Sequence, residues 1–422
     1  MMIYVVKKGD TVFKIAREYG VTPTRIEIIN GLNSRNPLVV GQALLILRPR
    51  ITHRVSRGDT VFSISQNYGI TEIELLQRNP TLIGRTLYEG ETLVIEYEEQ
   101  DATEGDFNGY AYPYINLNTL SRALVCLSEL TIFGYGFNMD GSLITINDEP
   151  LLASAKFYKA RPILLLSSIT GTGNFSSENA SKLFNDVALQ NKVLANIINT
   201  MQAKGYTGLD IDFEFIKPED KDAFVGFIEN SVAQLRPYGF TVNVDLAPKT
   251  SADQKGLLYE AHDYRAIGEI ADTVLIMTYE WGYTFGPPMA VAPLPNVRQV
   301  AEYALTEIPK EKITLGIPNY GYDWPLPFEK GVTMAETIGN EEAVMRALRS
   351  GAEIKFDEKA MAPFFEYRNH IVYFEDVRSI KAKLDLIKEL GLRGGGYWNI
   401  MRRFPPNWSL LSNEFFIKKY IE

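Results

Sequence analysis

The chain has 422 residues, of which 45% are hydrophobic and 23% are charged. This is ordinary globular usage, and the length suits a barrel-sized domain of about 250 residues or more that is joined to smaller modules. A net charge of -9 argues against a nucleic-acid partner, because phosphate-binding surfaces carry clustered Lys and Arg.

The N-terminal segment and the hydrophobicity along the chain bear on export and on membrane insertion. Residues 1–10 lack the basic segment, apolar stretch and cleavage site of a signal peptide, so we expect no classical signal peptide. No window approaches the roughly 18 consecutive apolar residues of a membrane span, so no membrane partner is expected. Cys126 is predicted to be a buried, unpaired thiol in an apolar run.

Two similar segments open the chain, at residues 2–48 and 51–97, and they are related by a shift of 49 residues. Gly9-Asp10-Thr11-Val12-Phe13 in the first returns as Gly58-Asp59-Thr60-Val61-Phe62 in the second. Each copy is predicted to be a small βααβ unit in which Gly supplies a turn conformation and Asp caps the first helix. Periodicity alone favours a purely structural role for this motif.

Both copies resemble lysin motif (LysM) modules over their whole length. The resemblance implies a shallow groove between two loops of each copy that binds glycans containing N-acetylglucosamine. The implied groove residues are Asp10, Thr11, Val12, Asn30 and Leu32 in the first copy, and Asp59, Thr60, Val61, Asn79 and Leu82 in the second. Pro80 and Thr81 replace Gly31 and Leu32 by register, so the two grooves are expected to differ in affinity. Two tethered weak sites raise avidity.

Residues 98–108 are acidic and nearly free of apolar side chains, which is typical of a linker. The sequence therefore predicts that the repeats and the rest of the chain fold independently.

Beyond the linker, short apolar runs alternate with amphipathic stretches, as in a parallel sheet with helical crossovers. Eight strands are predicted, at 109–115, 130–135, 163–168, 208–213, 241–246, 273–279, 313–318 and 395–399. Eight strands favour a closed (β/α)8 TIM barrel over residues 109–422, with a small α+β insertion at about 327–376, between strands seven and eight. A doubly wound open sheet is the alternative, but no Gly-x-Gly-x-x-Gly follows the first strand.

The fourth predicted strand carries three acids at every second position, Asp210, Asp212 and Glu214. Alternation places them on one face, which in a barrel points inward near the mouth where barrel active sites lie. Carboxylates so close together cannot all stay ionised, so one pKa is expected to rise far enough to keep a proton near neutral pH. The row therefore predicts a general acid.

Two other readings of this row are weaker. A solvent-facing edge strand would also alternate, but the flanking apolar runs indicate a central strand. A zinc site is not favoured, because the three histidines, at 53, 262 and 370, lie far from the acids in sequence. Mg²⁺ on carboxylates alone has no further support, so we expect no metal and no cofactor.

The large domain resembles glycoside hydrolase family 18. The family's fourth-strand signature, Asp-Gly-x-Asp-x-Asp-x-Glu, corresponds to residues 207–214, where only Thr207 departs from it. Met277-Thr278-Tyr279-Glu280 matches the family's Met-x-Tyr-Asp except at Glu280, whose longer side chain is expected to alter a subsite. Residues 318–322 and Trp398 also match.

The resemblance implies a (β/α)8 fold and substrate-assisted retaining hydrolysis without a protein nucleophile. It implies that Glu214 is the acid and base, that Asp212 holds the substrate acetamide and shares a proton or charge with Asp210, and that Tyr279 bonds the acetamide oxygen. The remaining implied substrate-binding residues are Trp398, Met277, Glu280, Trp281, Tyr112, Asn319 and Tyr320.

Two LysM-like repeats before such a barrel resemble the spore cortex-lytic N-acetylglucosaminidases of endospore-forming bacteria. This arrangement implies a monomer, placed in the spore or cell wall, that cleaves peptidoglycan after N-acetylglucosamine. A chitinase is the first alternative. A non-catalytic glycan-binding coat protein is the second, and the presence of Glu214 argues against it.

Overall fold

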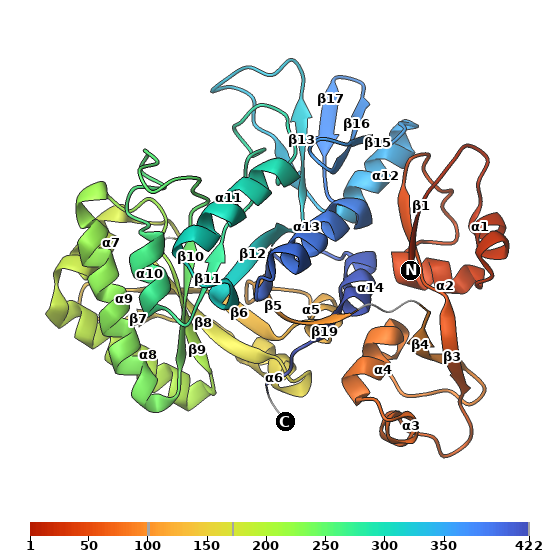
Figure 1. Ribbon diagram of the computed structural model, residues 1–422, viewed down its shortest axis with the longest axis horizontal. Coiled ribbons are helices and arrows are strands. Elements are labelled where there is room, and N and C mark those ends of the chain that lie inside the picture. Colours follow the sequence, from red (N-terminus) through yellow and green to blue (C-terminus); the bar gives the residue numbers. More distant parts are fainter. Residues whose placement is uncertain (99–101, 171–172, 421–422) are drawn as a thin grey trace.

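A computed structural model describes residues 1–98, 102–170 and 173–420, and its centre is a barrel of eight parallel strands (Figure 1). Strand β5 pairs with β6 on one side and with β18 on the other, which closes the sheet. The predicted TIM barrel is confirmed. Its strands are β5 (Thr103–Ala111), β6 (Glu129–Phe137), β8 (Arg161–Ser167), β9 (Gly208–Asp212), β10 (Thr241–Leu246), β11 (Thr273–Ile276), β12 (Ile313–Pro318) and β18 (Gly394–Trp398).

The barrel helices bury one apolar face each against these strands, as the amphipathic pattern predicts. They are α5 (Leu117–Leu124), α6 (Glu149–Phe157), α7 (Ser177–Asn185), α8 (Val187–Lys204), α9 (Lys221–Leu235), α10 (Tyr264–Ile270), α11 (Leu294–Glu307), α13 (Val377–Leu390) and α14 (Pro405–Glu414). Two short strands flank the barrel: β7 (Leu143–Ile144) pairs with β6, and β19 (Phe415–Ile417) pairs with β5. Within the described residues, no helix has the length and apolar character needed to cross a membrane.

The α+β insertion follows the seventh barrel strand and stands above the barrel in Figure 1. It contains a five-stranded antiparallel sheet in the order β14-β13-β17-β16-β15, with one helix. Its elements are β13 (Gly321–Pro325), β14 (Glu336–Ile338), α12 (Asn340–Ser350), β15 (Lys355–Asp357), β16 (Ala362–Tyr367) and β17 (His370–Tyr373). The insertion thus begins six residues earlier than the expected 327, because β13 pairs with β17 rather than extending the barrel.

Each N-terminal repeat forms the predicted βααβ unit. The elements are β1 (Met2–Val5), α1 (Val12–Tyr19), α2 (Pro23–Asn30) and β2 (Ala43–Ile46), then β3 (Pro49–Arg54), α3 (Val61–Tyr68), α4 (Glu72–Arg78) and β4 (Thr92–Tyr97). The expected Asp cap is wrong, because the Thr11 and Thr60 side chains accept the capping hydrogen bonds. Asp10 instead accepts from the Lys7 amide, at 2.8 Å, and so stabilises the preceding turn.

The linker prediction for residues 98–108 is also wrong in part. Strand β5 begins at Thr103, and Asp106 and Phe107 are buried in the barrel. The acidic composition of this segment indicated exposure to solvent. Arg393 pairs with Asp106 at 2.9 Å, however, and this ion pair allows the Asp106 carboxylate to be buried in the barrel. Residues 99–101 of the predicted linker lie outside the described residues.

The two repeats pack directly against the barrel. Helices α2 and α4 contact α14, and six side chains of the repeats belong to the same continuous hydrophobic core as the barrel: Ile29, Leu45, Leu47, Ile83, Val94 and Tyr97. The Ile354 amide donates to the Val40 carbonyl at 2.9 Å, and the Gln77 side chain donates to the Val125 carbonyl at 2.7 Å. The two halves are therefore in direct contact rather than joined by a linker alone.

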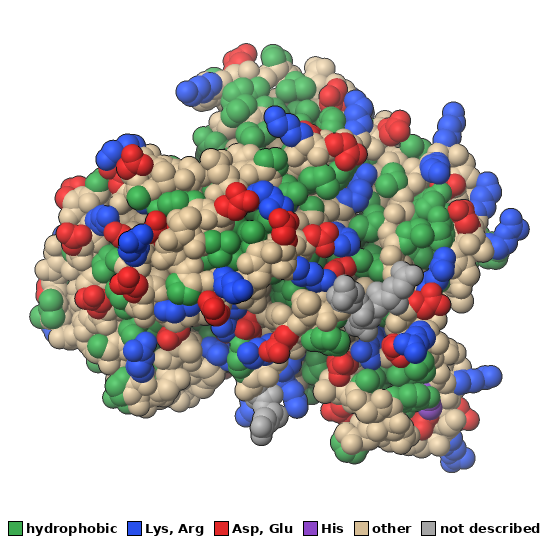
Figure 2. Space-filling model, in the orientation of Figure 1, with side chains coloured by type: hydrophobic (Ala, Val, Ile, Leu, Met, Phe, Trp, Pro, Cys, Tyr) green, Lys and Arg blue, Asp and Glu red, His purple; other side chains and the backbone are tan. Residues whose placement is uncertain are grey.

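Acidic and basic side chains are mixed over the face shown in Figure 2, in keeping with the modest net charge.

Candidate active site

The three acids of the fourth barrel strand lie where alternation predicts. Strand β9 is central, because it pairs with β8 and with β10, which excludes the edge-strand reading. Leu209 and Ile211 are fully buried in the core, while Asp210 and Asp212 share the opposite face. Glu214 follows the strand end and is partly exposed.

The side chains of Asp212 and Glu214 line a cavity of about 320 Å³ at the C-terminal ends of the barrel strands. Its described lining is Asp212, Glu214, Asp245, Pro248, Leu258, Tyr259, Met277, Tyr279, Glu280, Trp281 and Trp398. Seven of these were predicted from the sequence. Asp210 lies beneath the cavity, where the Thr131 hydroxyl is 3.4 Å from its Oδ2.

Asp245 and Tyr110 were missed by the sequence analysis. Asp245 lies on β10 beside the acids, and the Tyr110 hydroxyl oxygen lies 2.9 Å from Asp210 Oδ2 and 2.8 Å from Asp245 Oδ1. A phenol has one proton, so it can donate to only one of these oxygens. The other carboxyl group must then be protonated and donate to Tyr110. The alternation of Val242, Val244 and Leu246 with polar residues was the available signal.

Burial raises the pKa of every acid in this cluster. Burial raises the pKa of Asp210 to about 7, with a smaller contribution from Glu129. The pKa of Asp212 rises well above its ordinary value through burial, the Glu214 charge and the Asp210 charge. Burial and the Glu280 charge raise the pKa of Glu214. The site therefore binds protons that isolated carboxylates would release near neutral pH.

Glu280 forms one wall of the cavity and is held by two tyrosines. Its carboxylate accepts from the Tyr320 hydroxyl and, at 3.0 Å, from the Tyr322 hydroxyl. Its backbone φ is 67°, a conformation unfavourable for residues other than glycine. The β13 strand of the insertion thus fixes a carboxylate of the barrel. Tyr320 supports this acid rather than lining the cavity, and Tyr322 was not predicted.

Trp398 ends β18 and forms the apolar floor of the cavity. Tyr110, Tyr112 and Phe133 pack edge-on around its indole at centroid distances of 5.8, 6.1 and 5.5 Å. Asn319, predicted to bind substrate, is buried, and its amide donates to the Asn399 and Arg402 carbonyls. Asn319 therefore positions the loop that follows Trp398.

His262 holds the backbone next to Glu214. Its Nδ1 accepts from the Ala247 amide at 2.9 Å, so the proton lies on Nε2, which donates to the Phe213 carbonyl at 3.2 Å. Burial lowers the pKa of His262 to about 4, which keeps the ring neutral.

The stability contributed by His262 is expected to depend on pH. Because its folded pKa is below the unfolded value, this contribution is complete above about pH 6.5 and falls as the pH decreases toward 4, by up to about 3 kcal/mol. The difference in unfolding free energy between the parent and His262→Gln should shrink over this interval, as measured by urea denaturation. A difference that stays constant from pH 7 to pH 4 would contradict this role.

The predicted LysM groove residues of the first repeat line a second cavity, of about 800 Å³. Asn30 is one of the residues that line this cavity, while the side-chain amides of Asn30 and Asn79 bond within their own repeats. Both amides are buried and bond the backbone: Asn30 donates to the Ile26 and Leu45 carbonyls, and Asn79 to the Leu75 and Val94 carbonyls. Each asparagine thus joins a helix to the closing strand of its repeat. Val61 and Leu82 line a separate cavity beside the second repeat.

Comparison with known proteins agrees with this geometry. Residues 99–402 match the family described as glycosyl hydrolases family 18, and residues 4–46 and 53–96 match the LysM domain. The cortical fragment-lytic enzyme of Bacillus subtilis (strain 168) is 40% identical, with 99% of each chain covered, and that of Bacillus cereus is 38% identical. The crystal structure of the Bacillus megaterium spore cortex-lytic enzyme SleL covers 99% of both chains with a TM-score of 0.84 and 37% identity. The chain is a glycosidase that belongs to glycosyl hydrolase family 18 and carries two N-terminal LysM domains.

Proposed function

We propose that this chain hydrolyses spore cortex peptidoglycan at the β-1,4 bond after N-acetylglucosamine. The observation that carries the proposal is the grouping of Asp212, Glu214, Tyr279 and Trp398 around one cavity. The full-length similarity to cortical fragment-lytic enzymes supports the choice of substrate. The same similarity supports placement in the spore, where the LysM domains hold the enzyme to the wall.

The chemistry follows from the positions of the acids. Glu214 donates its proton to the glycosidic oxygen while the bond to the anomeric carbon breaks. The acetamido oxygen of the substrate attacks that carbon and forms an oxazolinium ion, so the protein supplies no nucleophile. Glu214 then takes a proton from the water that opens this ring, which restores the starting state.

Asp212 orients the acetamide. No described residue bonds its buried Oδ1, which leaves an acceptor for the acetamide N–H. Burial and the nearby Asp245 charge raise the pKa of Tyr279 well above its ordinary value, so the phenol keeps a proton for the acetamide oxygen. Trp398 supplies an apolar floor for the sugar ring.

Product analysis tests this function. The purified enzyme should release fragments with N-acetylglucosamine at the new reducing end from cortex peptidoglycan, and a thiazoline analogue of the oxazolinium ion should inhibit it. Muramic acid at the new reducing end would overturn the bond assignment. Faster turnover of chitin oligomers than of cortex fragments would favour a chitinase, the alternative that the shared family fold leaves available.

Asp212→Asn should reduce kcat strongly, by about 10²-fold, because an amide cannot give up a proton to become the negative partner of the positive charge that develops on the substrate. Asp210→Asn should be milder, because Asp210 lies below the cavity and acts through its neighbours. Steady-state kinetics on one soluble fragment compares the two. An equal loss in both variants would show that Asp210 and Asp212 function as one coupled pair, and would contradict a role in which only Asp212 contacts the substrate.

A further inference from the structure

The groove of the first LysM domain continues toward the active-site face of the barrel. Its cavity is closed on one side by helix α12 of the insertion, through Val344, Met345 and Leu348. A neighbouring cavity of about 920 Å³ shares six lining residues with it: Glu27, Gly31, Leu32, Asn33, Ser34 and Phe404. The two cavities therefore form one continuous groove between the LysM domains and the barrel.

The 920 Å³ cavity ends beside the active-site loops. Its lining includes Asn116, which caps α5, and Arg403, in the loop that follows Trp398. Two residues before Asn116, Tyr114 is 77% exposed and stacks on Tyr112 at 5.4 Å, and Tyr112 packs against Trp398. The loop that ends at Asn116 therefore places aromatic side chains between this cavity and Trp398.

The 920 Å³ part of this groove carries two guanidinium groups, Arg122 and Arg403, and Arg35 lines the part beside the first LysM domain. Arg122 donates to the Pro80 carbonyl at 3.1 Å and to the Asn118 amide oxygen at 3.2 Å, and no carboxylate among the described residues pairs with it. Arg403 makes a long ion pair with Glu341 at 3.6 Å. Burial lowers the pKa of Arg122, and the Arg403 charge adds to this effect.

A half-buried cation normally has a counter-ion, because its desolvation is otherwise not offset. Here a second cation stands nearby, and Glu27 is the single acid in the described lining of the 920 Å³ cavity. The part of the groove beside the first LysM domain is also lined by acids: Asp10, Glu341, Glu375 and Asp376. The lining mixes amides and hydroxyls, including Asn33, Gln77 and Thr119, with apolar side chains such as Phe404 and Trp408, and this combination suits a glycan. This environment fits an acidic ligand on a polar chain, in a protein whose net charge of -9 would otherwise repel it.

We propose that Arg122 and Arg403 bind carboxylate groups of the glycan strand that the first LysM domain holds. This inference rests on the proposed function, since it identifies a peptidoglycan strand as the occupant of the groove. Peptidoglycan offers such carboxylates in its stem peptides and in the lactyl group of muramic acid, whereas chitin has none. The site therefore selects an acidic glycan over a neutral one, at a distance from the bond that is cleaved.

Binding is measured in a Glu214→Gln background with octasaccharides of three kinds: peptidoglycan strands with stem peptides, the same strands after amidase has removed the peptides, and chitin. Arg122→Gln should weaken binding of an acidic strand about tenfold, as expected for one charge-assisted hydrogen bond, and leave chitin unchanged. A loss confined to strands with stem peptides identifies the peptide carboxylate, and a loss confined to amidase-treated strands identifies the lactyl carboxylate, which the amidase frees from its amide bond to the peptide.

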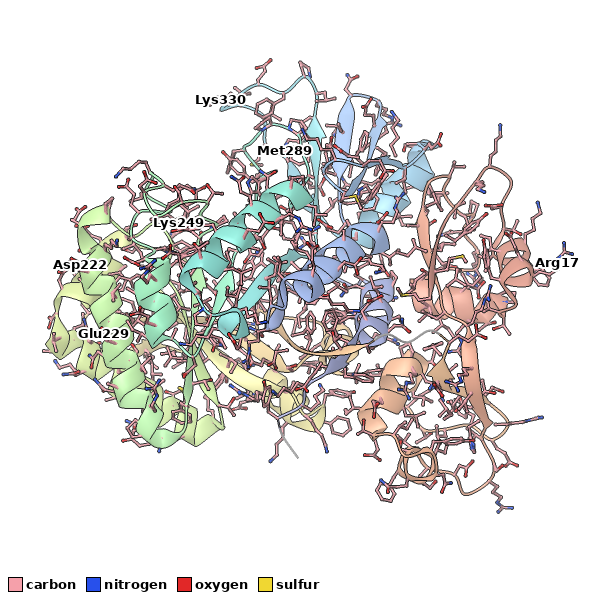
Figure 3. The ribbon with its side chains drawn as sticks, viewed as in Figure 1. Arg17, Asp222, Glu229, Lys249, Met289 and Lys330 are labelled. Carbon is pink, nitrogen blue, oxygen red and sulfur yellow. The ribbon has the colours of Figure 1, made fainter. Side chains whose placement is uncertain are left out.

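Three further variants separate charge from structure. Arg122→Lys keeps the charge and should retain part of the affinity, and Arg403→Gln, at an exposed side chain, should show the same selectivity without affecting folding. Arg17→Gln is the matched control, because Arg17 lies on the outer edge of the first LysM domain, away from the barrel (Figure 3).

Two results would overturn this site: equal affinity of the parent background for all three ligands, or an Arg122→Gln loss that includes chitin. Turnover by the Glu214-containing enzyme is recorded separately. If that enzyme fails to cleave cortex fragments, the proposed function fails, while carboxylate-dependent binding is still read directly from the titrations.

Discussion

Glu214→Gln is expected to reduce turnover by about 10²-fold or more, because the amide keeps the shape of the side chain but has no proton to transfer. Glu214 lines the cavity, and burial and the Glu280 charge raise its pKa, which favours the protonated form that a general acid needs. The measurement is kcat on a soluble cortex fragment.

Glu219→Gln provides the matched control, because Glu219 is an exposed glutamate five residues away. It should turn over at the parental rate, and both variants should melt at the parental temperature. If Glu214→Gln retains more than a tenth of the parental kcat, another group donates the proton and the assignment is wrong.

A chain that begins at Thr103 is expected to be much less stable than the whole chain. Removing both LysM domains uncovers α14, whose Trp408, Leu410 and Leu411 are buried in the core. Exposing several such side chains costs on the order of 5 kcal/mol, which corresponds to a decrease of roughly 10 °C or more in melting temperature. Calorimetry of the truncated and full chains measures this directly.

A chain that begins at Pro49 keeps the second LysM domain and should melt between the two, because α4 still covers part of α14. The full chain should unfold in one transition, since a single core runs through the barrel and both repeats. If the isolated barrel melts within about 2 °C of the full chain, the contacts with α14 contribute little to stability.

The sequence predicts the barrel and most of the catalytic cavity because both leave a periodic pattern. Asp210 and Asp212 stand at alternate positions between apolar residues, and this spacing identifies an inward face. Asp245 left a weaker signal, since it is the single acid in its strand. It joins the cluster because β10 pairs beside β9 in a register that places Asn243 next to Asp210, and this pairing is long-range.

The sequence misleads where burial decides the role. Asn30 and Asn79 recur at equivalent positions of the two repeats, which indicated a shared role, but repetition cannot distinguish sugar binding from an internal backbone contact. Ile29 and Leu45 contribute to the core shared with the barrel, and nothing local in the sequence records which surface covers them.

The direct packing of the repeats on the barrel changes how multivalency operates in this enzyme. With a flexible tether, the local concentration of the second site depends on linker length. Here the groove of the first LysM domain is bounded by α12. The cavity beside the second LysM domain is bounded by Phe157 and Tyr158 at the end of α6, so the two openings have fixed directions. Simultaneous binding therefore requires glycan segments already arranged at the matching spacing and angle, and the enzyme should gain avidity from a cross-linked wall more than from isolated strands in solution.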